Sequence, residues 1–327
     1  MSRKAIRAFT LGLVVLVVAT AGMLVWGSAA YDGPGPFGED TTIVLPRGSS
    51  VGRISQILES RGVIAHPDLF RTVVRASGLS GSLRAGEYLI PAGSSMRTVT
   101  ELLIDGETVV RRLTSAEGLT TVEVLRIVEQ HEALTGPVPA DVAEGTLLPE
   151  TYHYAYGDSR QEMVGRMQKA MTDLIAELWP SRIANLPIDT PGEAIILASI
   201  VEKETAVASE RARVAGVFVN RLRRGMRLQS DPTVVYALTE GSGPLGRRLT
   251  RSDLALESPF NTYRVGGLPP GPIANPGRAS LAAVLNPIET DDLYFVADGE
   301  GGHAFAKTLA EHQRNVRRWR RIRAQQD

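Results

Sequence analysis

An uncharged segment near the N-terminus, residues 8–30, limits what this chain can fold into more than any other feature. It is rich in leucine and valine. A helix rises about 1.5 Å per residue, so about 20 residues are enough to cross the core of a bilayer. Three basic side chains in residues 1–7 predict that this tail stays in the cytoplasm and that the rest of the chain is exported. We therefore expect one membrane-spanning helix over residues 8–30.

The same segment has a second interpretation, as a signal peptide that is removed after export. Ser28, Ala29 and Ala30 offer the small side chains that precede a cleavage site. The apolar region of a signal peptide is usually about 7–15 residues long, and this run is longer. Its length favours a retained anchor.

Composition narrows the class of protein. A length of 327 residues allows two domains, and 43% hydrophobic with 22% charged residues is typical of a folded protein. The formal net charge is zero, which argues against nucleic acid as the main partner. The lack of cysteine excludes disulfides and thiolate chemistry. The five histidines show no metal-ligand spacing, so we expect no metal and no cofactor.

A linker rich in glycine and proline, residues 31–40, separates the apolar run from a first folded unit at residues 41–106. Strands predicted at Thr41–Leu45 and Gly86–Ile90 flank two amphipathic helices, the second over Pro67–Ala76, and a third helix follows. This small α/β unit resembles the LysM-like modules that grip glycan chains. The alternative is a spacer domain without a ligand, because small folds carry many functions.

The remaining residues, 107–327, predict a mixed α+β domain. One helix is expected over Gln161–Trp179, and another runs from a Ser209 cap to Arg224, where Arg221 and its basic neighbours suit the negative helix end. A hairpin and a closing helix follow near the C-terminus. The predicted fold class is therefore α+β, with a membrane helix, a LysM-like module and a larger α+β domain.

Within this domain, the segment IILASIVEKET (195–205) is the most informative. Thr190, Pro191 and Glu193 precede it as a cap, a first helical residue and the partner of a capping box. This arrangement predicts a helix that begins at Pro191 and carries two carboxylates at its far end.

The helical period separates those two carboxylates. At about 100° per residue, Glu204 shares a face with the apolar Leu197, Ile200 and Val201, whereas Glu202 lies about 160° away. The two glutamates therefore cannot serve one site together. A carboxyl on an apolar face is desolvated, which raises its pKa and makes Glu204 a candidate general acid near neutral pH. The simpler interpretation is a helix-end glutamate that faces water or pairs with an arginine.

Two downstream segments have the composition of ordered turns. Asp231 is followed by Pro232, which predicts that Asp231 caps a short helix. The glycine- and proline-rich residues 266–277 cannot form regular structure. Such long loops often line functional sites, although a mobile surface loop is the alternative.

From Gly192 onward, the chain resembles the endolytic murein transglycosylases of the MltG or YceG-like family. The resemblance rests on long matches in one order rather than on a short motif. These are ASIVEKETAVASER (198–211), VFVNRLRRGMRLQSDPTVVYAL (217–238), NTY (261–263), GLPPGPIANPG (267–277) and LYFVADGEGGHAF (293–305), with EGTLLPETY (144–152) upstream.

The resemblance implies a protein anchored in the inner membrane, with its catalytic domain outside the cytoplasm, that cuts nascent peptidoglycan strands within the chain. Peptidoglycan synthases are candidate partners. The single catalytic glutamate of the family matches the second glutamate of EKET, which is Glu204. This chain departs from its relatives at Glu150, where aspartate is common, and at Ser230, where threonine is common.

One carboxyl is enough for the implied reaction. Glu204 would protonate the oxygen between N-acetylmuramic acid (MurNAc) and N-acetylglucosamine, and would then take the proton of the MurNAc C6 hydroxyl as a 1,6-anhydro ring closes. A hydrolysing muramidase that pairs Glu204 with Asp231 or Glu150, and a non-catalytic glycan-binding scaffold, are the rivals. Candidate substrate-binding residues are Gln229, Asp231, Asn261, Tyr263 and Glu150.

Overall fold

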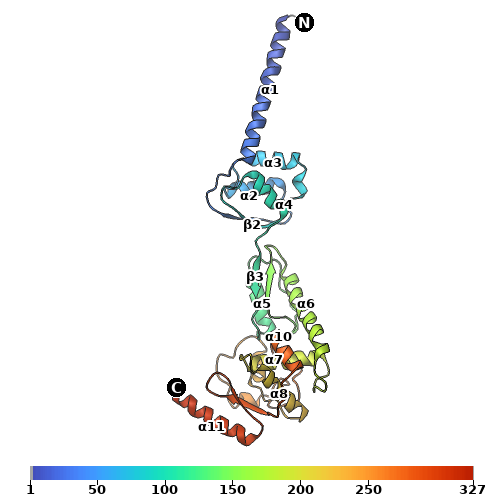
Figure 1. Cartoon of the computed structure of the whole chain (residues 1–327), viewed down its shortest axis with the longest axis vertical. Helices are drawn as coiled ribbons and strands as arrows, with labels where there is room; N and C mark the ends of the chain where they lie inside the picture. Colours follow the sequence, from blue (N-terminus) through green and yellow to red (C-terminus); the bar gives the residue numbers. More distant parts are fainter. Residues whose placement is uncertain (1–2, 327) are drawn as a thin grey trace. The chain divides into compact units, whose positions relative to one another are not determined.

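The computed structural model describes residues 3–326, so residues 1–2 of the predicted tail and residue 327 of the predicted last domain lie outside it. The chain has a mixed α+β fold and divides into two compact units. Unit 1 is the chain up to Arg111 together with His153–Asp158, and unit 2 is Arg112–Tyr152 together with the chain from Ser159 onward. Figure 1 labels their main elements.

The first part of the chain contributes one long helix and a small α/β module. Its elements are α1 (Arg3–Asp32), β1 (Thr41–Leu45), α2 (Val51–Ser60), α3 (Pro67–Ala76), the 3-10 helix η1 (Leu79–Gly81), β2 (Gly86–Ile90) and α4 (Met96–Asp105).

The second part is mainly helical. Its elements are β3 (Arg111–Thr114), α5 (Thr121–Gln130), β4 (Thr151–Tyr154), α6 (Arg160–Leu178), η2 (Trp179–Ser181), α7 (Pro191–Glu204), α8 (Arg211–Arg223), α9 (Asp231–Thr239), η3 (Asp253–Ala255), α10 (Arg278–Leu285), β5 (Tyr294–Ala297), β6 (His303–Ala306) and α11 (Leu309–Gln326).

Helix α1 carries the apolar N-terminal run. Its segment Phe9–Asp32 is long and apolar enough to cross a membrane, and it is the single such candidate in the described part of the chain. Most of its large apolar side chains are exposed. The last turn differs, because Tyr31 is buried and its hydroxyl donates to Thr100 Oγ1 of α4 at 2.9 Å. The helix therefore continues past residue 30, and the linker predicted at 31–40 begins inside α1.

The module after α1 has the predicted order of strand, helix, helix and strand. β1 and β2 pair in antiparallel register from Thr41↔Ile90 to Leu45↔Gly86. Buried side chains of both strands pack with α2, α3 and α4 into one hydrophobic core. Serine side chains cap α2 and α4, because each hydroxyl accepts a backbone N–H that the first helical turn leaves without a partner.

The core of unit 2 is built around α7. Thr190 accepts a hydrogen bond from the backbone of Glu193, and the Glu193 carboxylate accepts one from Thr190, which confirms the predicted capping box. One face of α7 is fully buried and packs against α8 and α10, which lie together in Figure 1. The eight-residue α10 was not predicted.

Two predicted helix caps are wrong. α8 begins at Arg211, after Glu210, so Ser209 does not cap it. α9 includes Asp231 as its first residue, and Ser230 precedes it without making a side-chain cap bond. In both places the polar side chain next to the helix start, Glu210 or Ser230, hydrogen-bonds another side chain instead.

The glycine- and proline-rich loop is an ordered part of unit 2. The backbone N–H of Ile273 donates to Ser199 Oγ of α7 at 3.0 Å. Asn275 is fully buried, and its side chain accepts from Leu147 N and donates to Leu119 O. These bonds tie the loop to three other segments, so it is not a mobile surface loop.

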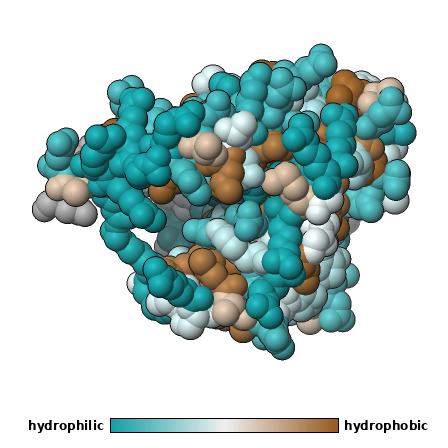
Figure 2. Space-filling view, turned by 90° about the horizontal axis from the view of Figure 1, so that it is seen from below, coloured by the Kyte–Doolittle hydropathy of each residue, from teal (hydrophilic) through white to brown (hydrophobic). Residues whose placement is uncertain are grey.

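The predicted C-terminal hairpin is present. β5 pairs with β6 in antiparallel register from Tyr294↔Ala306 to Ala297↔His303, and α11 packs against both strands. β3 and β4 form a separate two-stranded sheet. Figure 2 shows a mainly hydrophilic face of the molecule, with a hollow at whose edge hydrophobic residues gather.

Candidate active site

Glu204 lies in a cavity of about 470 Å³ on unit 2. It is the last residue of α7, just past the buried face of that helix. Gln229, Asp231 and Tyr263 line the same cavity. The structure therefore brings together four of the residues that the sequence nominated, from three separate segments of the chain.

The surroundings of Glu204 place the pKa of its carboxyl close to neutral pH. Ser230 Oγ donates a hydrogen bond to Glu204 Oε1 at 2.5 Å. Burial raises the pKa of Glu204 to about 7, and the charge of Asp231 acts in the same direction. The Ser230 hydroxyl and the charges of His303 and Arg221 oppose this rise in pKa. The protonated and ionised forms therefore coexist near neutral pH, which suits a group that must both give and accept a proton.

Asp231 and Tyr263 form one wall of the cavity. The Tyr263 hydroxyl donates to Asp231 Oδ1 at 2.6 Å. Burial, followed by this hydrogen bond, raises the pKa of Tyr263 and keeps it a phenol. The neighbouring Gln229 has a φ of 51°, a left-handed conformation that costs a non-glycine residue about 1 kcal/mol or more. Its backbone N–H donates to Thr262 O at 3.1 Å, which holds this strained turn against the loop of Tyr263.

Arg221 supplies a buried positive charge at the cavity. The sequence predicted only that it would complement the negative end of its helix. It is 7% exposed, and its guanidinium donates to Leu293 O at 2.7 Å and to Leu228 O at 2.6 Å. Burial lowers its pKa. It lies in the last turn of α8, as predicted, and it also lines the cavity. Its spacing from the buried Val217 and Phe218 is the signal that could have revealed it.

His303 and Glu210 form a second pair that the sequence analysis missed. His303 lines the cavity, and its Nδ1 lies 2.7 Å from Glu210 Oε2, while its backbone N–H donates to Glu210 Oε1. A carboxylate only accepts hydrogen bonds, so the Nδ1 of His303 carries the proton of this contact. Both residues lie inside the long matches to the family, which could have nominated them.

Two nominated residues are not in the cavity. Asn261 is fully buried, its amide donates to Leu254 O and Leu256 O, and its Oδ1 accepts from Tyr263 N. Its contacts position the loop of Tyr263 and leave no group for a substrate. Glu150 is exposed and lines neither cavity that contains Asp231.

Glu202 faces a different part of unit 2. Its side chain is 6% exposed, accepts from Gly277 N at 2.9 Å and lies 3.7 Å from the guanidinium of Arg211. Burial and then the charge of Glu202 raise the pKa of the nearby Glu117. Glu202 is absent from the lining of the Glu204 cavity, as the helical period predicted.

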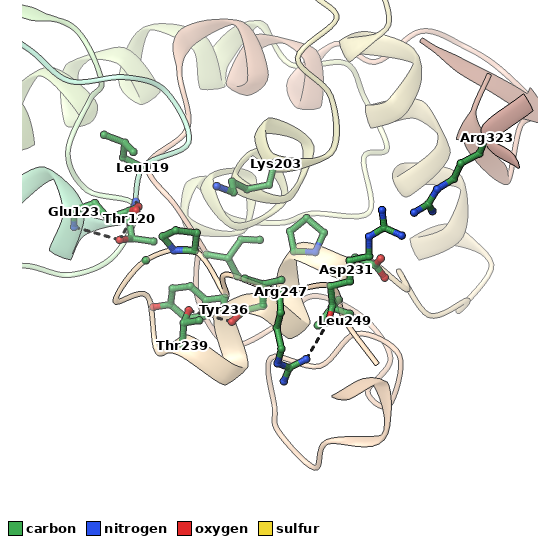
Figure 3. Close-up of a pocket in the computed structure, with 16 residues that line it drawn as sticks. Leu119, Thr120, Glu123, Lys203, Asp231, Tyr236, Thr239, Arg247, Leu249 and Arg323 are labelled. Carbon is green, nitrogen blue, oxygen red and sulfur yellow. Dashed lines mark hydrogen bonds between the residues drawn. The ribbon is translucent and has the colours of Figure 1, made fainter. Parts of the chain in front are cut away.

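A larger cavity, of about 800 Å³, adjoins the first one, since Asp231 lines both. Lys203 of α7, several residues of α9 and the loop after α9 line it, and Figure 3 shows Arg323 extending from α11 toward Asp231. Across residues 3–326, no group of three or more histidine or acidic side chains is arranged to hold a metal ion. The groups in both cavities are suited to hydrogen bonding and proton transfer.

Comparison with known proteins shows the family of this chain. The family described as YceG-like matches residues 43–318, which is most of the chain. The chain belongs to the YceG-like family. A YceG-like protein of Listeria monocytogenes, known from a crystal structure, superposes with a TM-score of 0.54 at 31% sequence identity. The match covers 84% of this chain and 98% of the Listeria chain.

Curated YceG-like relatives carry the name endolytic murein transglycosylase. The one from Bacillus subtilis is 31% identical over 303 residues, which covers 83% of this chain and 82% of the relative. The one from Streptococcus pneumoniae strain R6 is 31% identical over 323 residues, with 84% of this chain and 57% of the relative covered. The chain thus spans a little over half the length of that pneumococcal relative.

Proposed function

We propose that this protein is a membrane-anchored endolytic transglycosylase that cleaves the bond between MurNAc and N-acetylglucosamine within peptidoglycan strands. The observation that carries the proposal concerns Glu204. Its carboxyl lines a cavity, and the pKa of that carboxyl is raised to about 7. Curated relatives of the same family are named for this activity.

Glu204 would act first as the acid. Its protonated carboxyl would give a proton to the glycosidic oxygen, and the bond to the MurNAc anomeric carbon would break with development of positive charge on that sugar. The groups that favour ionised Glu204, namely the Ser230 hydroxyl, His303 and Arg221, would stabilise the carboxylate that this step creates.

The same carboxylate would then act as the base. It would remove the proton of the MurNAc C6 hydroxyl, whose oxygen would attack the anomeric carbon and close a 1,6-anhydro ring. The nucleophile belongs to the substrate, so neither a water molecule nor a covalent enzyme intermediate is needed. Glu204 returns to its protonated state, and the product ends in 1,6-anhydroMurNAc.

The cavity walls would position the sugars. Gln229, Asp231 and Tyr263 offer hydrogen-bond donors and acceptors for hydroxyl and acetamido groups. Tyr294 and Phe295 add aromatic surface that suits the apolar C–H faces of sugar rings. Asn261 would act indirectly, through the loop that it holds.

α1 would anchor the enzyme in the inner membrane with its N-terminus in the cytoplasm and the catalytic unit outside. The support is the length and apolarity of α1 together with the basic residues at its start. The LysM-like module would grip the glycan, and peptidoglycan synthases would be partners in the membrane. A retained anchor predicts that the protein isolated from membranes still contains Trp26, which mass spectrometry of its N-terminal peptide can test.

A hydrolysing muramidase is the second candidate, because Asp231 places another carboxyl in the same cavity. In that mechanism Asp231 would activate water or attack the sugar, with Glu204 as the acid. Both enzymes would need Glu204, and their products differ at the new MurNAc end.

The test is digestion of uncross-linked glycan strands by the full-length chain in detergent, with mass spectrometry of the fragments. The transglycosylase gives 1,6-anhydroMurNAc ends, and Glu204→Gln abolishes them. Reducing MurNAc ends would establish the muramidase instead. Failure of the folded wild type to cut any strand would favour a third candidate, a non-catalytic glycan-binding scaffold.

A further inference from the structure

The larger cavity shares a wall with the Glu204 cavity and differs from it in charge. Helix α9 supplies the common wall, because Asp231 lines both cavities while Pro232, Val235 and Tyr236 line only the larger one. On α7, Lys203 lines the larger cavity and the next residue, Glu204, lines the smaller one. The two cavities therefore lie next to each other, on either side of Asp231.

The charged groups of the larger cavity are not equally available. The Arg247 guanidinium is already bonded to both oxygens of Asp253, at 2.6 and 3.0 Å. The Glu123 carboxylate accepts from the backbone N–H of Thr120 as part of a capping box. The Asp231 carboxylate accepts from Tyr263. These three charged groups therefore have partners within the protein.

Lys203 and Arg248 differ from these three groups. Lys203 is exposed, and its ammonium donates to the backbone carbonyl of Gly118 at 3.1 Å, a neutral partner that leaves further donors available. Arg248 is exposed and has no ion-pair partner within residues 3–326. The cavity thus offers positive groups from two different elements, Lys203 of α7 and Arg248 of the loop after α9, and Figure 3 labels Lys203 among the residues that line it.

The chemistry of the proposed substrate supplies a matching branch. Each MurNAc of an unprocessed strand carries a short peptide on its lactyl group, and this stem peptide contains alanine methyl groups and free carboxylates. Val235, Ile273 and Leu249 provide apolar wall for the methyl groups. A volume of about 800 Å³ lies in the range of cavities that enclose ligands of this size, roughly 300–1,000 Å³.

We propose that the larger cavity binds the stem peptide of the MurNAc at or next to the cleaved bond, with Lys203 and Arg248 pairing with its carboxylates. The enzyme would then select strands that still carry their peptides and would discriminate against glycan from which the peptides have been removed. This inference rests on the proposed function, since it concerns a branch of the same substrate.

The experiment compares three substrates of equal glycan length with the full-length chain in detergent. They are uncross-linked strands with intact stem peptides, the same strands with the peptides removed by an amidase, and strands whose stem carboxylates are chemically amidated. The measured quantity is kcat/KM for formation of new MurNAc ends. We expect the intact strands to be preferred by about tenfold over both others, the scale of two partly exposed ion pairs, and the preference to shrink at high salt.

The double variant Lys203→Gln/Arg248→Gln tests the residues. It should reduce the preference for intact strands to about twofold or less, mainly through a higher KM on that substrate. Arg251→Gln is the matched control, because Arg251 is an exposed arginine of the same loop that does not line the cavity, and it should keep the wild-type preference.

The outcomes separate the two proposals. If the wild type cuts intact and peptide-free strands equally well, the stem-peptide site is wrong and the transglycosylase proposal stands. A preference that persists with amidated stems, or that the double variant retains, would overturn the role of the two cations. If no substrate is cut, or if Glu204→Gln cuts as well as the wild type, the proposed function itself fails.

Discussion

The two ends of one short motif, Glu202 and Glu204, lie on opposite sides of α7 and meet different surroundings. The oxygens of Glu202 face Gly277 N and the Arg211 guanidinium, and Glu202 does not line the Glu204 cavity. Glu204 has one hydroxyl partner, Ser230, and an open cavity in front of it. Both carboxyls are largely removed from water on folding, but only Glu204 lines the cavity that Gln229, Asp231 and Tyr263 share.

This contrast shows how a buried carboxyl can be assigned to structure or to chemistry. A charge with a backbone N–H and a guanidinium as partners is stabilised in its ionised form and joins distant segments. A carboxyl that is desolvated without a direct cationic partner is held near the point where it exchanges its proton. The four predictions below test that assignment.

The largest expected effect is the loss of activity in Glu204→Gln. An amide of the same shape cannot donate the catalytic proton, so kcat should fall by about 10²- to 10⁴-fold on uncross-linked strands. Glu202→Gln is the matched change on the other side of the helix. It should keep activity within about threefold and lose about 1 kcal/mol of stability, because it weakens a charge-assisted hydrogen bond. Equal loss of activity in both variants would remove the basis of the comparison.

The second prediction concerns stability and pH. The pKa of Glu204 is raised from 4.5 to about 7, so the folded protein binds this proton more tightly than the unfolded chain. The resulting stabilisation is fully present below pH 4.5 and is lost as the pH rises through 7. In Glu204→Gln the side chain does not ionise, so the stability of this variant does not fall in the same way as the pH rises. Its stability relative to wild type should therefore increase by about 3 kcal/mol between pH 4 and pH 8.

Hydrogen exchange of the α7 amides measures this difference locally, after correction for the intrinsic effect of pH on exchange. A difference between the two proteins that does not change with pH would mean that Glu204 is not desolvated in solution. Glu202→Gln serves as the control, since its wild-type carboxylate has a guanidinium nearby.

The third prediction tests the imidazole beside Glu204. His303→Phe keeps an aromatic ring and removes Nε2 from the cavity, so we expect kcat/KM to fall about tenfold, the kinetic equivalent of one hydrogen bond to a charged group. His131→Phe, outside the cavity, is the control for a general effect of losing a histidine. Unchanged kcat/KM in His303→Phe would leave the Glu210–His303 pair with a structural role only.

The smallest expected effect is a shift of the pH profile in Ser230→Ala. The Ser230 hydroxyl lowers the pKa of Glu204, so its removal should move the alkaline limb of kcat/KM to higher pH, with a change of a few-fold in the maximum. Ser230→Thr retains the hydroxyl and should keep the wild-type profile. Movement of the limb to lower pH in Ser230→Ala would contradict the assigned hydrogen bond.

Local features of the fold could be predicted from the sequence. The capping box of α7 involves residues three positions apart, and the strands of the first module follow from short apolar runs bounded by turn residues. The position of Glu204 at the end of a buried face also follows from the helical period. Each of these features depends on residues within a few positions of one another, and sequence periodicity describes such short-range relations.

The parts that could not be predicted depend on contacts between distant segments. Burial of Glu202 requires Gly277, which lies 75 positions away. Ser230 does not cap α9, because its hydroxyl is bonded to Glu204, 26 positions away. Asn261 was a candidate for the substrate because it lies in a family motif and offers hydrogen-bond donors and an acceptor, but its amide instead donates to backbone carbonyls of its own loop. The sequence alone does not specify which distant group a polar side chain will hydrogen-bond.

The buried contact between Tyr31 and Thr100 has a mechanical consequence. It joins the last turn of α1 to α4, and α1 also packs against α3, so the helix and the module after it belong to one compact unit. In the proposed anchored state, any tilt or rotation of α1 in the bilayer would be transmitted to the module. Lipid thickness would thereby influence the angle at which that module meets the glycan.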